Sequence, residues 1–378
     1  MKLALTEEQE MLRQAARDFL GDKCSKAFVR QMEESESGYS GELWQEMADL
    51  GWMGLALPEQ YGGGGFTFLD LAVLLEEMGR ACLPGPFFST VVLGSLPVLE
   101  FGSEEQKQRY LPGAIRGEKM LSLASAESSF ANPCGAGITL EATREGDSYV
   151  IKGTSLFVPD AHIADCLLCI VKTKPEDKVA IVLADARSTQ MSCVPLKSIG
   201  GDKLCEVIFD RLAVPKSDVL VQEDRGWDAV ERIVRRAALA KCCEMVGCIQ
   251  RVLEMTVTYA KERKQFDRPI GSFQVIQHYC ADMATDVDGA RFSTYQAAWM
   301  MSQGLPCARE VAIAKAWMGE ASRRVMNLAH QIHGAIGVSM EHELHYYTRR
   351  AKAAELAFGD ADFYREVIAR EMGLCQDR

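Results

Sequence analysis

The stretch from Tyr259 to Gln274 carries the residue types that a bound dinucleotide needs. A basic helix end that includes Arg263 leads into a loop with Phe266 and a polar amide at Gln274. A guanidinium binds phosphate through paired hydrogen bonds, and a phenylalanine ring packs on a planar base. Many helices also end in Lys and Arg because the helix dipole favours cations there. The stretch alone therefore leaves a nucleotide site and an ordinary helix end as alternatives.

A second stretch, from Gln331 to Gly337, combines a polar amide with two glycines, Gly334 and Gly337. Glycine has no Cβ, so its backbone can approach a ligand closely. The same pattern is typical of a turn that ends a helix, and in isolation it favours that interpretation. The chain has no GxGxxG after a predicted N-terminal strand, so the sequence does not support a Rossmann-type nucleotide site.

The elements that would position these residues follow the order helix, strand, helix. Thr6 and Gln9 form a predicted capping box, and apolar residues then recur at helical spacing to about residue 120. Between about 121 and 222, short β-rich runs alternate with Gly, Pro and Asp, which predicts a compact β unit. Long helices return after Trp227 and predict an antiparallel bundle; the four helical stretches are 226–264, 272–303, 306–333 and 360–373.

Composition restricts the function classes. The chain has 378 residues, 48% of them hydrophobic, and a formal net charge of −11, which argues against a general affinity for nucleic acid or anionic membranes. The sequence contains no apolar run of about 20 residues, so it does not predict a transmembrane helix. The 13 cysteines show no zinc spacing and no disulfide framework, so we expect buried thiols in a reducing, cytoplasmic setting. The histidines give no convincing metal site.

Taken in this order, the motifs resemble those of the acyl-CoA dehydrogenase family. Three further segments match family positions: the loop 58–63, Glu127 after Leu123–Ala126, and the segment from Gly153 to Asp165. The resemblance covers essentially the whole chain. It implies an α+β multidomain fold with a helical N-terminal domain (1–121), a β-barrel-like middle domain (122–222) and a C-terminal four-helix bundle (223–378). It also implies a homotetramer, or a heterotetramer with a related subunit.

The resemblance further implies FAD as cofactor, held between the middle domain and the bundle and contacted by a neighbouring subunit. Arg263 would meet the pyrophosphate, Phe266 the adenine side, and Gln274 the cofactor nearby. Gln331 and Gly334 would belong to the adenosine-diphosphate site presented to the adjacent subunit. The flavin ring would be lined by Ala126, Phe157 and Val158.

The reaction that the resemblance implies is α,β-dehydrogenation of an acyl-CoA thioester. A carboxylate removes a proton from the α carbon while the β hydrogen leaves as hydride to the flavin, and electrons then pass to an electron-transfer flavoprotein. Such a base must lie within reach of the α carbon, and its pKa must be raised by burial. Hydrogen bonds to the thioester oxygen must stabilise the developing enolate.

The sequence departs from the family at the base. The family places a glutamate in a turn before the last helix, and counting 27 residues from Gln331 puts Phe358 at that position. Some relatives carry the base on the first bundle helix instead, where this chain has Ala237. Proline at position 159, in place of a residue with an amide hydrogen, also changes the expected surroundings of the flavin.

Two acids remain as catalytic candidates, and each has a structural alternative. Asp360 lies two residues past Phe358 and is equally suited to cap the last helix. Glu244 lies seven residues, about two helical turns, beyond Ala237 and so falls on about the same helix face; it could instead form a structural ion pair. The sequence thus leaves two hypotheses: a flavin enzyme with a non-standard base, or a non-catalytic subunit that supports the cofactor of a related, base-carrying chain.

Overall fold

The computed structural model describes residues 4–125 and 137–374. The chain divides into two compact units. The first, which we call the bundle unit, comprises Met1–Val29, Phe68–Leu83 and Ala238–Arg378; the second, the sheet unit, comprises Arg30–Thr67 and Pro84–Ala237. The two units are built from interleaved segments, whereas the predicted domain boundaries at 121/122 and 222/223 follow sequence order and stay a prediction.

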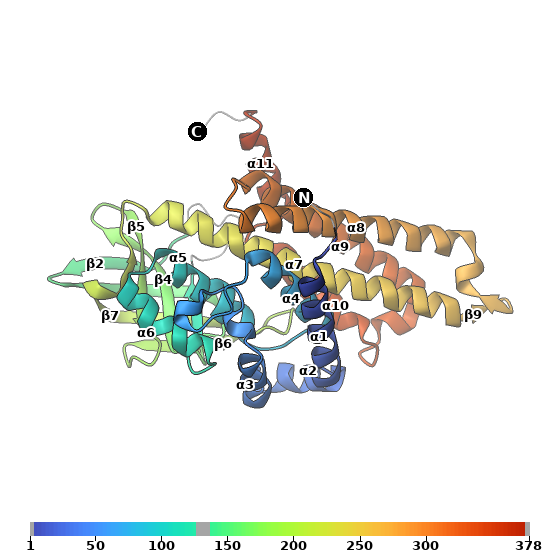
Figure 1. Cartoon of the computed structure of the whole chain (residues 1–378), viewed down its shortest axis with the longest axis horizontal. Coiled ribbons are helices and arrows are strands. Elements are labelled where there is room, and N and C mark those ends of the chain that lie inside the picture. Colours follow the sequence, from blue (N-terminus) through green and yellow to red (C-terminus); the bar gives the residue numbers. More distant parts are fainter. Residues whose placement is uncertain (1–3, 126–136, 375–378) are drawn as a thin grey trace. The chain divides into compact units, whose positions relative to one another are not determined.

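The bundle unit is built on three long helices, α7, α8 and α9, which run alongside one another (Figure 1). Their apolar faces share one core, in which Ile249, Val287 and Val325 are fully buried. The helices of the unit, some of which begin or end beyond it, are α1 (Glu7–Lys23), α2 (Lys26–Glu34), α4 (Phe68–Ala81), α7 (Gly226–Glu262), α8 (Gln274–Ser302), α9 (Ala308–His333), α10 (Leu344–Leu356) and α11 (Ala361–Glu371).

Two glycines let α4 and α7 cross in close contact. A Cβ on Gly79 would lie 1.8 Å from the backbone oxygen of Glu244, and a Cβ on Gly247 would lie 1.8 Å from the backbone oxygen of Glu76. No side chain fits at either point, so the two backbones touch here. This contact fixes the position of Glu244 along α4.

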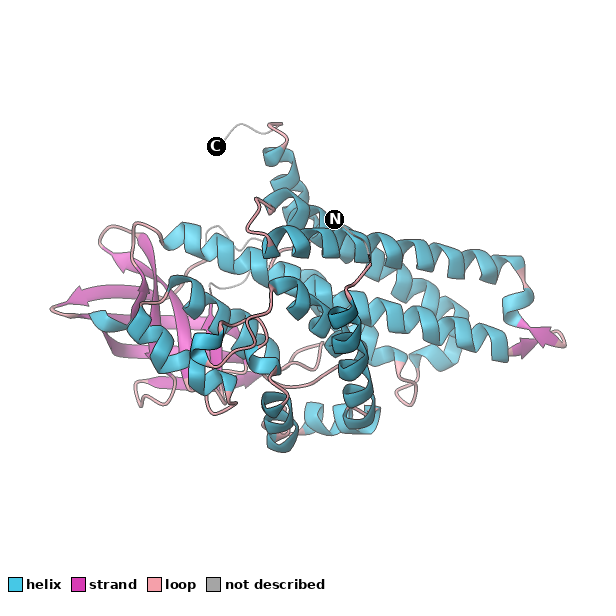
Figure 2. Ribbon diagram, in the orientation of Figure 1, coloured by secondary structure: helices cyan, strands magenta, loops and turns pink. Residues whose placement is uncertain are grey.

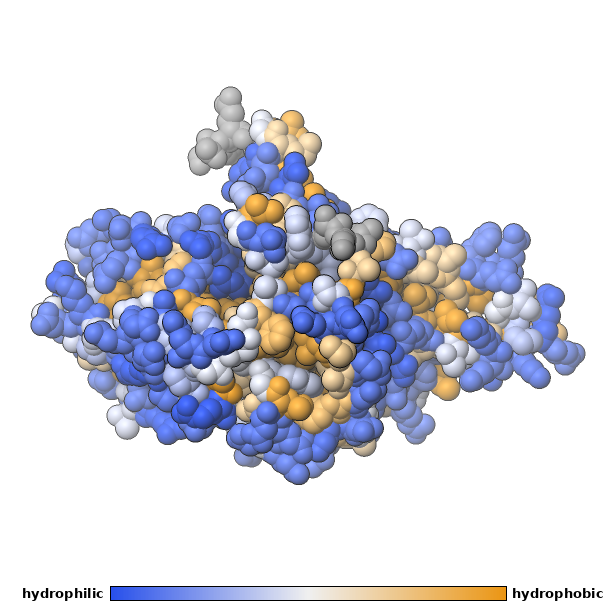
Figure 3. Space-filling model, in the orientation of Figure 1, coloured by the Kyte–Doolittle hydropathy of each residue, from blue (hydrophilic) through white to orange (hydrophobic). Residues whose placement is uncertain are grey.

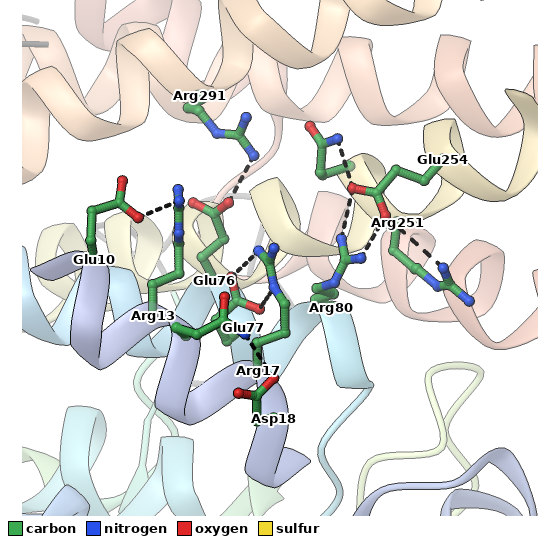
Figure 4. Close-up of polar contacts among 12 residues, drawn as sticks. Glu10, Arg13, Arg17, Asp18, Glu76, Glu77, Arg80, Arg251, Glu254 and Arg291 are labelled. Carbon is green, nitrogen blue, oxygen red and sulfur yellow. Dashed lines mark hydrogen bonds and ion pairs between the residues drawn. The ribbon is translucent and has the colours of Figure 1, made fainter. Parts of the chain in front are cut away.

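Ion pairs surround the crossing (Figure 4). Arg17 of α1 donates two hydrogen bonds to the buried carboxylate of Glu77, at 2.6 and 2.9 Å. Beside them, Glu76 accepts from Arg291 and from the Tyr295 hydroxyl, both at 2.7 Å. Buried carboxylates are tolerated because guanidinium and hydroxyl donors satisfy their oxygens. Helices α1, α4 and α8 are therefore joined by charge as well as by apolar packing.

The sheet unit holds an eight-stranded mixed sheet in the order β6-β7-β3-β2-β4-β5-β8, with β1 also paired to β4 (Figure 2). Alternate residues such as Ile151 and Val207 fill its core. Its strands are β1 (Leu121–Ala124), β2 (Glu141–Glu145), β3 (Ser148–Pro159), β4 (Cys166–Lys174), β5 (Lys178–Asp185), β6 (Met191–Leu196), β7 (Leu204–Pro215) and β8 (Val219–Val221). Its helices are α3 (Gly41–Asp49), α5 (Leu96–Phe101) and α6 (Glu104–Ile115), with a π-helix at Phe88–Ser95.

The predicted α, β, α order is confirmed, and so is the fold class. The capping box of Thr6 and Gln9 begins α1 as expected, and Ser103 begins α6 in the same way. The sequence did not single out α2, α10 or the π-helix. Gly79 lies inside α4, which continues to Ala81, and it serves the crossing with α7.

Within residues 4–125 and 137–374, no helix has the length and apolar character needed to cross a membrane. On the face drawn in Figure 3, hydrophilic residues predominate, with hydrophobic ones near the end of α11. Met372 and Leu374 are exposed there.

Candidate functional site

The end of α7 presents Arg263 and Phe266 to solvent. Directly after this helix the chain forms a hairpin of β9 (Lys264–Gln265) and β10 (Arg268–Pro269), and α8 begins at Gln274 (Figure 1). Phe266, at the hairpin tip, has φ 51° and is 86% exposed. A large apolar ring held in solvent in a left-handed conformation is uncommon, and such features often mark a ligand or partner surface. Arg263 and Gln274 are exposed on either side of it.

The end of α9 lies against the end of α7. The ring of His333 stacks on Tyr259, with centroids 4.5 Å apart, and the Tyr259 hydroxyl donates to the backbone oxygen of His333 at 3.5 Å. Because Tyr259 is one helical turn before Arg263, this contact brings the two predicted nucleotide-binding stretches to the same end of the bundle. Burial lowers the pKa of His333, which favours the neutral ring in the stack.

Gly334 ends α9 in a conformation that suits close approach by a ligand. Its φ is 63° and its ψ is −141°, a combination that favours glycine, and a Cβ added there would meet nothing within 4 Å. Gln331 is exposed one turn earlier on α9. A bare backbone, an exposed amide and the exposed guanidinium of Arg263 together fit an adenosine-diphosphate group.

In the sheet unit, strand β3 carries the segment predicted to line the flavin ring. Pairing of β3 with β7 is interrupted by a bulge between Ser155 and Val158, and Phe157 within it has φ 56° and is 36% exposed. Bulges re-aim side chains and are frequent beside active sites. Val158 is buried in the sheet core, so its backbone is the part most suited to a ligand. Ala126 lies outside the described residues.

Phe358, at the expected position of the base, occupies the turn between α10 and α11. Its side chain is buried, its φ is 58°, and its backbone oxygen accepts from the Tyr364 hydroxyl at 2.8 Å. Two residues on, the Asp360 carboxylate accepts from the backbone N–H of Phe363 at 2.9 Å and caps α11. The structural role predicted for Asp360 is therefore confirmed, while its catalytic role stays a prediction.

Lys315 of α9 holds this turn from inside the bundle. Its side chain is 2% exposed, and Nζ donates to the backbone oxygens of Glu355 and Gly359 at 3.1 and 2.6 Å. Burial lowers the pKa of Lys315 to about 8. The sequence argument missed this lysine, although its helical spacing from Val311 and Met318 places it on the apolar face of α9.

Glu244 reaches the same neighbourhood from α7. Its carboxylate pairs with the amino group of Lys241, one turn earlier, at 2.5 Å. Lys241 in turn lines a cavity of about 10 Å³, room for a single water, together with Lys315 and Glu355. The structural ion pair expected as the alternative for Glu244 is thus present. The cavity is thus lined by Lys241, the partner of Glu244, and by Lys315, which holds the turn of Phe358.

Among the described residues, no group of three or more His, Cys, Asp or Glu side chains is placed to hold a metal ion. His342 and His345, three residues apart, were the pair that most resembled metal ligands in the sequence. The ring of His342 lies edge-on to His333, and the ring of His345 lies against Tyr346. Both rings therefore take part in aromatic packing.

Comparison with known proteins identifies the family to which this site belongs. Residues 6–118 match the model of the acyl-CoA dehydrogenase N-terminal domain, and residues 224–373 match that of the C-terminal domain. A protein of Bacillus subtilis (strain 168) described as probable acyl-CoA dehydrogenase YngJ is 32% identical, over 98% of this chain and 100% of the relative. The chain belongs to the acyl-CoA dehydrogenase family. Its cofactor is FAD, and it is a flavin oxidoreductase of the class that acts on CH–CH bonds.

Two further acyl-CoA dehydrogenase relatives bear on the finer function. The 3-(aryl)acrylate reductase of Clostridium sporogenes (strain ATCC 15579) is 30% identical, over 97% of this chain and 99% of the relative. The crystal structure of the ChsE4–ChsE5 complex from Mycobacterium tuberculosis superposes with a TM-score of 0.91 at 29% identity, covering 100% of both chains.

Proposed function

We propose that this acyl-CoA dehydrogenase family member removes the α proton of an acyl-CoA thioester with Glu244, in place of the family glutamate that Phe358 replaces. The observation that carries the proposal is how each carboxylate is used. The Asp360 carboxylate accepts from a backbone N–H of α11, whereas the Glu244 carboxylate is paired with the side chain of Lys241. If Glu244 leaves Lys241 to take up a proton, α7 keeps its backbone hydrogen bonds. If Asp360 leaves its cap, α11 loses the hydrogen bond that begins it. Asp360 is the second candidate.

The remaining roles are assigned to residues at the two places described above. Bound FAD supplies a ring that accepts the β hydrogen as hydride. Arg263 would hold the pyrophosphate, with Phe266 and Gln274 beside the adenine side, and Gln331 with Gly334 would hold the adenosine diphosphate of the adjacent subunit. Phe157, Val158 and Ala126 would line the ring. An electron-transfer flavoprotein in the cytoplasm would take up the electrons.

A second candidate function is favoured by the same turn. Phe358 is buried and apolar where the family carries its base, and the chain superposes over its whole length on a subunit of a complex that has two named components. The chain would then be a cofactor-supporting subunit of a heterotetramer, and a related subunit would supply the base. In the first candidate, the chain acts as a homotetramer.

Anaerobic flavin bleaching by a panel of acyl-CoAs tests the first candidate. We expect the purified chain to bleach, Glu244→Gln to slow bleaching at least 100-fold, and Asp360→Asn to keep the parent rate. Equal rates in the parent and both variants would remove both carboxylates from consideration. A chain that retains flavin and bleaches only when co-purified with a related subunit would establish the second candidate instead.

A further inference from the structure

Two cysteines of the sheet unit lie diagonally across neighbouring strands. Cys193 on β6 pairs with Val207, and Cys205 on β7 pairs with Pro195. Since residues two apart on a strand share a face, Cys193 and Cys205 point to the same side of the sheet. The two thiols are therefore diagonal neighbours on one face of β6 and β7. The sequence, in which the two are scattered single cysteines, gave no sign of this pairing.

His162 forms a third member of this group. Its Nδ1 lies 3.8 Å from Sγ of Cys205, and its Nε2 lies 3.1 Å from the backbone oxygen of Ser37. A carbonyl oxygen only accepts, so Nε2 carries hydrogen, and Nδ1 faces the sulfur either as an acceptor or, in the imidazolium, as a donor. The hydrogen bond with Cys205 raises the pKa of His162. The shift is in the direction that favours a protonated ring beside Cys205.

The electrostatics of Cys205 set it apart from the buried thiols. The neighbouring side chains of Cys193 and His162 lower the pKa of Cys205, with Cys193 contributing most. By contrast, burial raises the pKa of other described cysteines, which keeps them as unreactive thiols: Cys24, Cys166, Cys169, Cys242, Cys243 and Cys248. The thiolate is the reactive form of cysteine.

Access to this pair comes from the edge of the sheet. Cys205 is 1% exposed, but Cys193 is partly exposed, and its strand β6 is the last in the sheet order. Among the residues that the structure describes, β6 is paired only to β7. An edge strand can shift more easily than a central one. A small oxidant can thus reach the pair past Cys193.

We propose that Cys193 and Cys205 are a reversible redox pair that hydroperoxides oxidise to a disulfide across β6 and β7. The thiolate attacks the peroxide, the O–O bond breaks, and the departing oxygen takes up a proton as an alcohol, or as water from hydrogen peroxide. The second sulfur then attacks the sulfenic acid, the S–O bond breaks, and the hydroxyl leaves as water with the second thiol's proton. Two electrons pass from sulfur to the peroxide.

Closing this bond would act on the segment next to it. Cys205 pairs with Val158 on β3, one residue from the bulged, exposed Phe157. A disulfide needs a sulfur–sulfur distance of about 2.05 Å and a fixed torsion, so its formation draws β6 and β7 together. The strain is passed to β3 through its ladder with β7. Any effect on bound flavin rests on the proposed function, whereas the disulfide itself does not.

Peptide mapping of the folded protein after stoichiometric hydrogen peroxide tests the pair. We expect a linked peptide containing Cys193 and Cys205, with the mass loss of two hydrogens, that a dithiol reductant reverses. Cys280, a partly exposed cysteine on α8, serves as the internal control and should remain reduced. Oxidation of Cys280 before any linked peptide forms would overturn the proposal.

Two variants test the first oxidation step, which takes place before the disulfide forms. In Cys193→Ser, which changes a partly exposed edge residue, Cys205 should stop at the sulfenic acid and be trapped by dimedone. In His162→Gln, the rate of oxidation should fall about tenfold as the thiolate loses its partner. Absence of the dimedone adduct, or an unchanged rate, counts against the pair. A change in the visible flavin spectrum on oxidation reports the coupling to Phe157 separately.

Discussion

The amino group of Lys315 donates to the backbone oxygen of Gly359 at 2.6 Å, and so ties α9 to the turn that holds Phe358. A second hydrogen bond goes to the backbone oxygen of Glu355. The turn between α10 and α11, where the base was expected from the sequence, is therefore supported by a buried lysine.

The depressed pKa of Lys315 predicts a pH dependence of stability. The folded protein releases this proton near pH 8, whereas the unfolded chain keeps it to about pH 10.4. Between these values the unfolded state binds more protons, so Lys315 makes unfolding less favourable as pH rises, by about 2 kcal/mol from pH 7 to pH 10. Denaturant titrations at several pH values give the free energy of unfolding, and its dependence on pH should differ by this amount between the parent and Lys315→Met. Parallel curves would show that Lys315 titrates normally.

The cap at Asp360 can be separated from catalysis. Asparagine caps a helix as well as aspartate, so Asp360→Asn should leave the unfolding midpoint nearly unchanged, whereas Asp360→Ala should lose about 1 kcal/mol. Thermal unfolding followed by circular dichroism measures both. If Asp360→Asn is as stable as the parent but no longer bleaches flavin, Asp360 and not Glu244 is the base.

Alanine should destabilise the protein at Gly79, where α4 crosses α7 closely, and stabilise it at Gly21, which has free space around it. Gly79→Ala would place a methyl group on the backbone oxygen of Glu244, which forces the helices apart and should cost about 3 kcal/mol or prevent folding. Gly21→Ala, in α1, meets nothing within 4 Å and should stabilise the protein by about 0.5–1 kcal/mol. A stable Gly79→Ala protein would show that the crossing can relax.

Sequence reasoning located the elements better than the contacts among them. A helix cap involves only residues three or four apart, so the capping boxes of α1 and α6 and the cap at Asp360 could be predicted from short stretches of sequence. The partners of Lys315 lie 40 and 44 residues away, and Cys205 and His162 are 43 residues apart. Such groups become neighbours only through the packing of α9 or the register of β7, which periodicity does not encode.

The proposed nucleotide-binding end of the bundle predicts a specific loss of cofactor. Replacing Arg263 with alanine removes an exposed guanidinium at the end of α7 and touches no buried contact, so stability should change by less than about 0.5 kcal/mol while flavin affinity falls at least tenfold. Arg323→Ala is the matched control, because Arg323 is also exposed but lies two turns before Gln331 on α9. The flavin-to-protein ratio from the visible spectrum, measured after dialysis against increasing salt, reports the affinity. Equal retention in the two variants would place the pyrophosphate elsewhere, and loss in both would point to a general effect of net charge.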